Sequence, residues 1–208
     1  MLDFAKLIEE FAPRATEVLA EAEASDIAAI SAVSKKDSAK RAEEVLRWLR
    51  DYSALRGIRS TCCHEVVHAF LKWADDKGRP LEIRGPDEIC KAHLSLSNAC
   101  ALDELKGRRL TSLVSKMLWL RYPKTVPIFD RNAERALQVL CKLDKRIPLL
   151  GSHPIEYEAF VRVWDAYFNR NIEQILAANS NGYPYPIRIF DIILWKLGSP
   201  SYLIKWQW

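Results

Sequence analysis

The stretch from Leu110 to Leu137 reads LTSLVSKMLWLRYPKTVPIFDRNAERAL and contains two helical patterns joined by a short turn. Apolar residues recur at helical spacing up to Tyr122, and Pro123 ends this pattern because its ring cannot continue a helix. Asp130 is suited to accept a hydrogen bond from the free N–H groups of a following helix, expected to run to about Leu140. The stretch therefore predicts a helix, a proline-flanked turn and a second helix.

Helical patterns continue on both sides of this stretch. Pro13 stands between the first two apolar segments and is expected to divide them into separate helices. Pro186 occupies a first-turn position at the start of the last segment, where its missing N–H costs nothing. The other expected helices cover residues 2–11, 14–33, 38–56, 58–76, 86–100, 153–178 and 186–198.

No segment shows the alternation of apolar and polar residues, bounded by hairpin turns, that is typical of a strand. The sequence therefore predicts an all-α fold, a compact multi-helix array with few or no strands. We expect an N-terminal helical region over residues 1–104 and a second helical region over residues 105–208, which together form one compact unit.

The composition is that of a globular protein. The chain has 208 residues, of which 49% are apolar, enough for a sizeable core. No apolar run approaches the length of a bilayer-spanning helix, and the first residues alternate charged with apolar residues rather than forming a signal peptide. Five cysteines without framework spacing, among them the adjacent Cys62 and Cys63, indicate free thiols. We therefore expect a cytoplasmic protein without a membrane partner.

The net charge of +4 is distributed unevenly along the chain. Residues 106–146 contain eleven Lys or Arg and three acidic residues, a balance of +8, so the remainder of the chain sums to −4. Such a concentration is typical of a surface that contacts nucleic-acid phosphates, although solvated helix faces give the same pattern.

A second motif, HEVVH at residues 64–68, matches the HExxH pattern of zinc metallopeptidases. On a helix this spacing places His64 and His68 one turn apart on one face, where both can bind one zinc ion, and Glu65 would activate the metal-bound water. Glu88 is the best-spaced third ligand, with Asp87 and His93 as other candidates; the alternative is two histidines with an ordinary structural role. This pattern makes a zinc hydrolase an alternative function, with zinc as its cofactor.

The 110–137 stretch carries a lysine in the middle of its first helix and an aspartate at the start of its second. Lys116 and Asp130 can in this arrangement supply an amine and a carboxylate to one reacting carbon. Base excision uses such a pair, because a deprotonated lysine attacks the sugar C1′ while an aspartate stabilises the developing positive charge. Asp130 would serve as a helix N-cap in either case.

These residues resemble the helix-hairpin-helix DNA glycosylase superfamily, and most of all the compact bacterial proteins described as 8-oxoguanine DNA glycosylase-like. That group carries an SK…P…FPI(Y/W)D segment, which stands here as Ser115-Lys116, Pro123 and Val126–Asp130. Residues 157–167 and 187–198 are also similar, the latter to that group's closing helix. The resemblance covers about residues 105–198.

The resemblance implies a DNA glycosylase with lyase activity that needs no cofactor. Lys116 would be the Schiff-base nucleophile and Asp130 its catalytic carboxylate. Leu120, Phe190 or Trp195 would contact or stack on an extruded base. The partner would be duplex DNA, damaged or undamaged, held by basic residues of the 106–146 region: Lys106, Arg108, Arg109, Lys124, Arg131 and Arg135. An alternative is a nucleic-acid-binding or defence-associated module that keeps this fold without excising bases.

Overall fold

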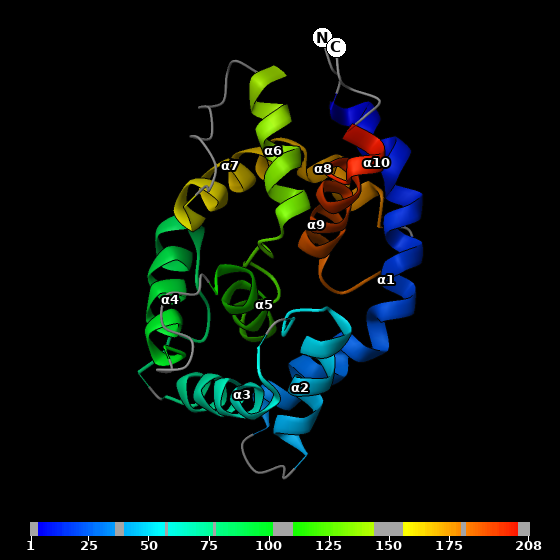
Figure 1. Cartoon of the computed structure of the whole chain (residues 1–208). Coiled ribbons are helices and arrows are strands. Elements are labelled where there is room, and N and C mark those ends of the chain that lie inside the picture. The colour runs from blue at the N-terminus through cyan, green and yellow to red at the C-terminus, as the bar shows by residue number, and fades with distance from the viewer. Residues whose placement is uncertain are drawn as a thin grey trace. The chain divides into compact units, whose positions relative to one another are not determined.

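The computed structural model describes residues 4–35, 40–56, 58–76, 78–101, 110–143, 156–179 and 182–203. These residues form ten α-helices with connecting turns, and no strand occurs among them, which confirms the all-α prediction (Figure 1). Within the same described ranges, none of the helices combines the length and the apolar character needed to cross a membrane.

The chain divides into two compact units, residues 22–126 and residues 1–21 with 127–208. This division differs from the expected boundary after residue 104. Helix α1 (Phe4–Ser34) passes from one unit into the other, and the chain changes unit again between Val126 and Pro127. The stretch that suggested one catalytic segment is therefore divided between the units.

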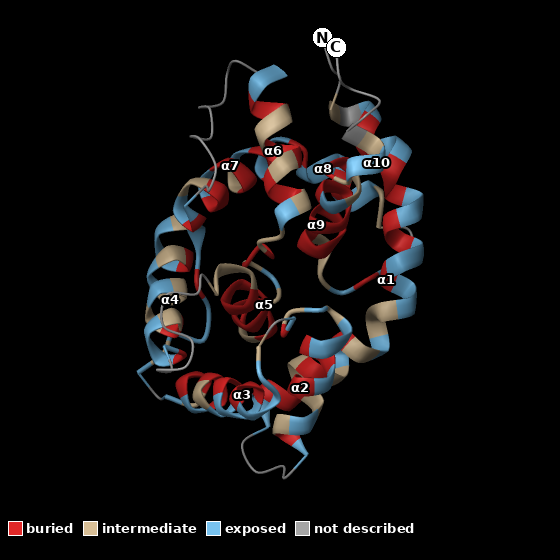
Figure 2. Cartoon of the chain, viewed as in Figure 1, coloured by how far each residue is buried: buried red, intermediate tan, exposed pale blue. Residues whose placement is uncertain are grey.

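The 22–126 unit contains a helix, α5 (Thr111–Arg121), that is buried on every side along residues 113–120. Its other helices are α2 (Arg41–Asp51), α3 (Ser60–Ala74) and α4 (Gly85–Ala99), and α4 packs on α5. Residues 113–120 of α5 are all buried, as expected for a helix without a polar face (Figure 2). The indole rings of Trp48 and Trp119 stack with centroids 5.5 Å apart.

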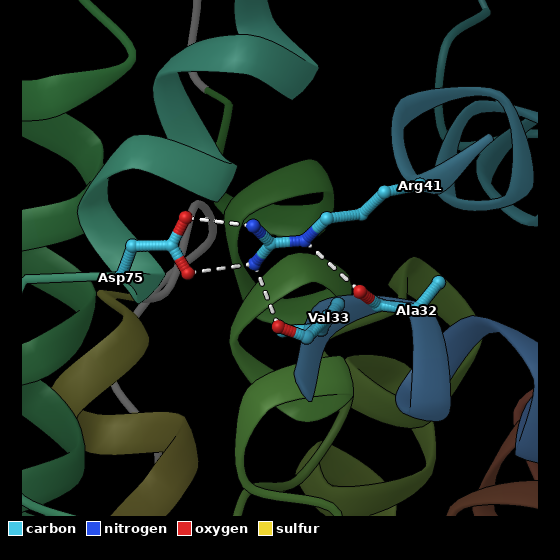
Figure 3. A network of polar contacts seen from close by, with 4 residues as sticks. All are labelled: Ala32, Val33, Arg41 and Asp75. Carbon is cyan, nitrogen blue, oxygen red and sulfur yellow. Dashed lines mark hydrogen bonds and ion pairs between the residues drawn. The ribbon is translucent and has the colours of Figure 1, made fainter. Parts of the chain in front are cut away.

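Arg41 fixes the end of α1 within this unit (Figure 3). Its guanidinium donates to the carbonyls of Ala32 and Val33 at 2.9 and 2.6 Å, where the last turn of α1 has no further N–H partners. The remaining guanidinium N–H groups form a two-bond ion pair with Asp75, at 2.6 and 2.9 Å. One buried cation thus joins the end of α1, the start of α2 and the end of α3.

The second unit contains helices α6 to α10 and the first part of α1. Their bounds are α6 (Arg131–Leu143), α7 (Tyr157–Arg170), α8 (Ile172–Ala177), α9 (Pro186–Leu197) and α10 (Pro200–Leu203). Helix α9 is buried along most of its length and packs lengthwise against α6 (Figures 1 and 2). Its observed limits agree with the predicted helix over 186–198, with Gly198 just beyond its end.

The sequence-based interpretation was wrong about Pro13, which lies inside the continuous helix α1. Its ring removes one backbone hydrogen bond, to the carbonyl of Glu9, and both residues face solvent, where water can hydrate that carbonyl. Buried Phe11 and Ala15 on the opposite face keep the helix packed on both sides of the proline.

The helix expected over 153–178 is also divided. Residues 153–155 lie outside the described residues, and Asn171 separates α7 from α8. The buried Asn171 side chain donates to the Tyr167 carbonyl at 2.7 Å, a bond that competes with the regular helix pattern. The predicted helices over 58–76, 86–100 and 110–122 agree with α3, α4 and α5.

Candidate active site

Lys116 lies in the middle of α5 and is buried, with only 6% of its surface exposed. Its ammonium nitrogen Nζ donates to the Ser112 hydroxyl, one turn earlier, at 2.9 Å. Lysine is rarely buried to this degree, because removing an ammonium group from water is costly unless it is hydrogen-bonded. The sequence pattern located this lysine on a helix but did not predict its burial.

Asp130 is the N-terminal cap of α6, as predicted. Its carboxylate oxygen Oδ1 accepts from the Asn132 N–H at 2.8 Å, and its carbonyl accepts from the Glu134 N–H, which begins the helix. Asp130 is half-buried, and its second carboxylate oxygen is not used by this cap. The capping role and a chemical role are therefore compatible.

Lys116 and Asp130 belong to different units, since the unit boundary lies between Val126 and Pro127. Each has its own support within its unit: Ser112 for the lysine, and the start of α6 for the aspartate. The joint site that the resemblance implies stays a prediction.

Asp191 is a residue to which the sequence-based interpretation assigned no chemistry, yet it supports the turn that precedes α6. This aspartate of α9 is 3% exposed; Oδ2 accepts from the Ile128 N–H at 3.1 Å and Oδ1 from the Trp164 indole N–H at 2.8 Å. Burial raises the pKa of Asp191 to about 7, and the nearby Arg188 guanidinium opposes this shift. The signal in the sequence was an acid between apolar residues in IFDIIL.

The predicted DNA contacts are only partly described. Lys106, Arg108 and Arg109 lie outside the described residues. Lys124 and Arg131 are exposed and Arg135 is half-exposed, so these three can reach a phosphate backbone. They divide between the units, with Lys124 in one and the two arginines on α6 in the other.

Two of the three residues suggested as base contacts are buried. Leu120 is 1% exposed and Phe190 is fully buried, so neither presents a free face on which a base could stack. Phe190 instead packs edge-on against Phe4, with ring centroids 6.0 Å apart. Trp195 is 41% exposed and is the member of this set with accessible ring surface. Leu120 and Phe190 are buried because neighbouring segments cover α5 and α9 almost completely. The sequence pattern does not show this covering, so it suggested both residues as accessible.

The HEVVH segment lies on helix α3, as predicted, with His64, Glu65 and His68 exposed. The third ligand is not assembled beside them: among the described residues, which include all the candidates, no group of three His, Cys, Asp or Glu side chains could hold a metal ion. Glu88 instead accepts a hydrogen bond from the Arg84 backbone N–H at the start of α4. Its carboxylate thus caps a helix, a common role for an acid in the first turn.

His93, another candidate zinc ligand, lies partly buried between α4 and the start of α5. Burial lowers the pKa of His93 to about 4, while its hydrogen bond at the Thr111 backbone favours the protonated ring and opposes this shift. The structure therefore assigns this ring, in its neutral form, to the contact between two helices.

Because the pKa of His93 is lowered, we expect the protein to lose stability in acid. Its pKa is depressed in the folded protein, so the unfolded chain binds the proton more readily, and stability falls as the pH decreases from about 6.5 to about 4. Relative to His93→Gln, we expect wild-type protein to lose about 2 kcal/mol across this window. Urea unfolding of both proteins at several pH values measures the difference. A constant difference between pH 4 and pH 7 would contradict this role.

No protein-family model, curated protein or solved structure matches this chain.

Proposed function

We propose that this protein binds duplex DNA and excises a base, with Lys116 as the nucleophile and Asp130 as the assisting carboxylate. The buried, hydrogen-bonded amine of Lys116 is the observation that carries the proposal. Lysine is rarely buried, and amine catalysis is one of the known roles of a buried lysine. The resemblance of the surrounding residues to DNA glycosylases supports the same reaction.

The reaction requires a neutral amine and an extruded nucleotide. The Lys116 Nζ lone pair attacks the sugar C1′, and the electron pair of the glycosidic bond leaves with the base, which takes up a proton. The C1′–O4′ bond of the sugar ring then breaks, and the nitrogen gives up its two protons, one to the ring oxygen and one to solvent, which leaves an imine between Nζ and C1′. The Asp130 carboxylate stabilises positive charge at the sugar during these steps.

The face of α6 that follows Asp130 supports contact with DNA phosphates. Arg131, Arg135 and Lys142 are separated by four and seven positions, which correspond to about one and two helical turns, so they lie along one side of the helix. Arg131 and Lys142 are exposed and Arg135 is half-exposed. A row of three cations on one helix face is suited to a phosphate backbone.

Lys116→Met should abolish covalent trapping on DNA. Methionine fills most of the space of the buried lysine stem but has no amine, so folding should be kept while the nucleophile is lost. Purified proteins are mixed with duplexes that contain 8-oxoguanine, a plain abasic site or no lesion, and borohydride reduces any imine to a stable amine. We expect the trapped fraction to fall by at least about 100-fold.

Two further variants separate chemistry from folding and binding. Asp130→Asn keeps an oxygen that can cap α6 but removes the negative charge, and it should reduce trapping while leaving DNA affinity intact. Lys142→Ala removes an exposed cation and should weaken DNA binding without preventing trapping at saturating DNA. DNA binding without any wild-type adduct would refute excision and leave a binding module. An adduct that persists in Lys116→Met would refute the assigned nucleophile.

A further inference from the structure

Helix α9 supports the turn that carries Asp130. Asp191 reaches the backbone of this turn two residues before Asp130, where its carboxylate accepts the Ile128 N–H at 3.1 Å. The other carboxylate oxygen is anchored by the Trp164 indole N–H of α7 at 2.8 Å. A single buried side chain therefore connects the turn to both α9 and α7. Ile128 and Asp191 are 63 positions apart in the sequence.

A second contact from the same helix lies just beyond Asp130. Gly198, immediately after α9, is so close to α6 that an added Cβ would lie 1.7 Å from the Asn132 carbonyl oxygen. Ile128 and Asn132 each lie two residues from Asp130: the Ile128 N–H is hydrogen-bonded by Asp191 of α9, and the Asn132 carbonyl is in close contact with Gly198. The carboxylate of Asp130 is thus carried by a backbone that is held on both sides.

The charged groups around Asp191 are Arg188, one turn earlier on α9, and Asp130 itself. Burial and Asp130 favour the protonated carboxyl, while Arg188 and the N–H groups of Ile128 and Trp164 favour the carboxylate. With the pKa of Asp191 raised to about 7, the strength of its hold on the turn responds to pH near neutrality. A carboxylate accepts both N–H bonds at full strength, whereas a protonated carboxyl does so less strongly.

We propose that Asp191 is a positioning residue that fixes the Pro127–Asp130 turn through the Ile128 N–H and so sets where the Asp130 carboxylate stands. It does not itself reach DNA, because it is buried. Its effect on catalysis rests on the proposed function. Its effect on the turn does not, and can be measured in protein without DNA.

Asp191→Asn tests the anchor, with Asp165→Asn on α7 as the matched control. Asparagine retains one oxygen acceptor, so one of the two N–H groups loses its partner, whereas Asp165 is half-exposed and lies on the same helix as Trp164. Hydrogen exchange, followed by NMR, should accelerate by about 10-fold or more at the Ile128 amide or at the Trp164 indole N–H in Asp191→Asn, and stay unchanged at both in Asp165→Asn. In wild-type protein, the Ile128 amide and Trp164 indole resonances should shift together with a midpoint near pH 7.

The DNA experiment is run in parallel. At saturating DNA, the single-turnover trapping rate of Asp191→Asn should fall by about 10-fold while its DNA affinity stays within about 2-fold of wild type. Unchanged exchange at both N–H groups, or independent titration of the two resonances, would overturn the anchor. Faster Ile128 exchange with an unchanged trapping rate would overturn the positioning role. If wild-type protein forms no adduct, the proposed excision is refuted. The NMR experiment, which uses no DNA, then decides by itself whether Asp191 holds the turn. If Asp191→Asn does not fold, the wild-type titration decides the same question.

Discussion

Gly198→Ala is expected to destabilise the protein by about 3 kcal/mol or more, a larger effect than most single methyl additions produce. A Cβ at this position would lie 1.7 Å from the Asn132 carbonyl oxygen and 3.0 Å from the Ala136 backbone nitrogen. Both neighbours are backbone atoms of α6 and cannot rotate away as a flexible side chain would. The methyl group can be accommodated only if α6 and α9 move apart, which opens their shared apolar contact.

Urea unfolding measures this loss, and Gly78→Ala is the control. At Gly78 the nearest atom to an added Cβ is the side-chain oxygen Oδ1 of Asp76 at 3.5 Å, an ordinary contact. We therefore expect Gly78→Ala to change the unfolding free energy by no more than about 0.5 kcal/mol. Equal stabilities for Gly198→Ala and wild type would show that α6 and α9 do not approach as closely as described.

Arg41→Ala is expected to cost about 2–3 kcal/mol, because it leaves two buried carbonyls without a donor and breaks an ion pair with the part-exposed Asp75. The guanidinium donates four hydrogen bonds, two to carbonyls at the end of α1 and two to Asp75. Its removal leaves the Ala32 and Val33 carbonyls without this donor and Asp75 without its cation. Both consequences act on one junction of three helices (Figure 3).

Arg41→Lys distinguishes shape from charge. A lysine keeps the positive charge but has no planar fork of N–H groups, so it cannot bind a carboxylate through two parallel bonds while also reaching two carbonyls. We expect it to recover less than half of the stability lost in Arg41→Ala. Arg47→Ala, at an exposed ion pair with Glu44, should change stability by no more than about 0.5 kcal/mol. Full recovery by lysine would contradict the role assigned to the fork geometry.

Local features of the sequence predicted much of this fold. Helical spacing of apolar residues located α3, α4, α5 and α9, because the sides of a helix are set by residues only three or four positions apart. The cap of α6 followed from Asp130 for the same reason, since its carboxylate binds an N–H two residues later. Pro13 was misread because the sequence does not show that its side of the helix faces solvent.

The tertiary structure decided which of these residues can act. Lys116 and Phe190 are buried because other helices cover them, and no pattern within α5 or α9 reports that covering. The partners of Arg41 and Asp191 lie up to 34 and 63 positions away, so only the folded chain brings them together. The sequence alone thus located α3, α4, α5 and α9 and the cap of α6, which depend on near neighbours. Burial, the Asp191 anchor and the close approach at Gly198 depend on contacts between distant segments, and the tertiary structure alone determines them.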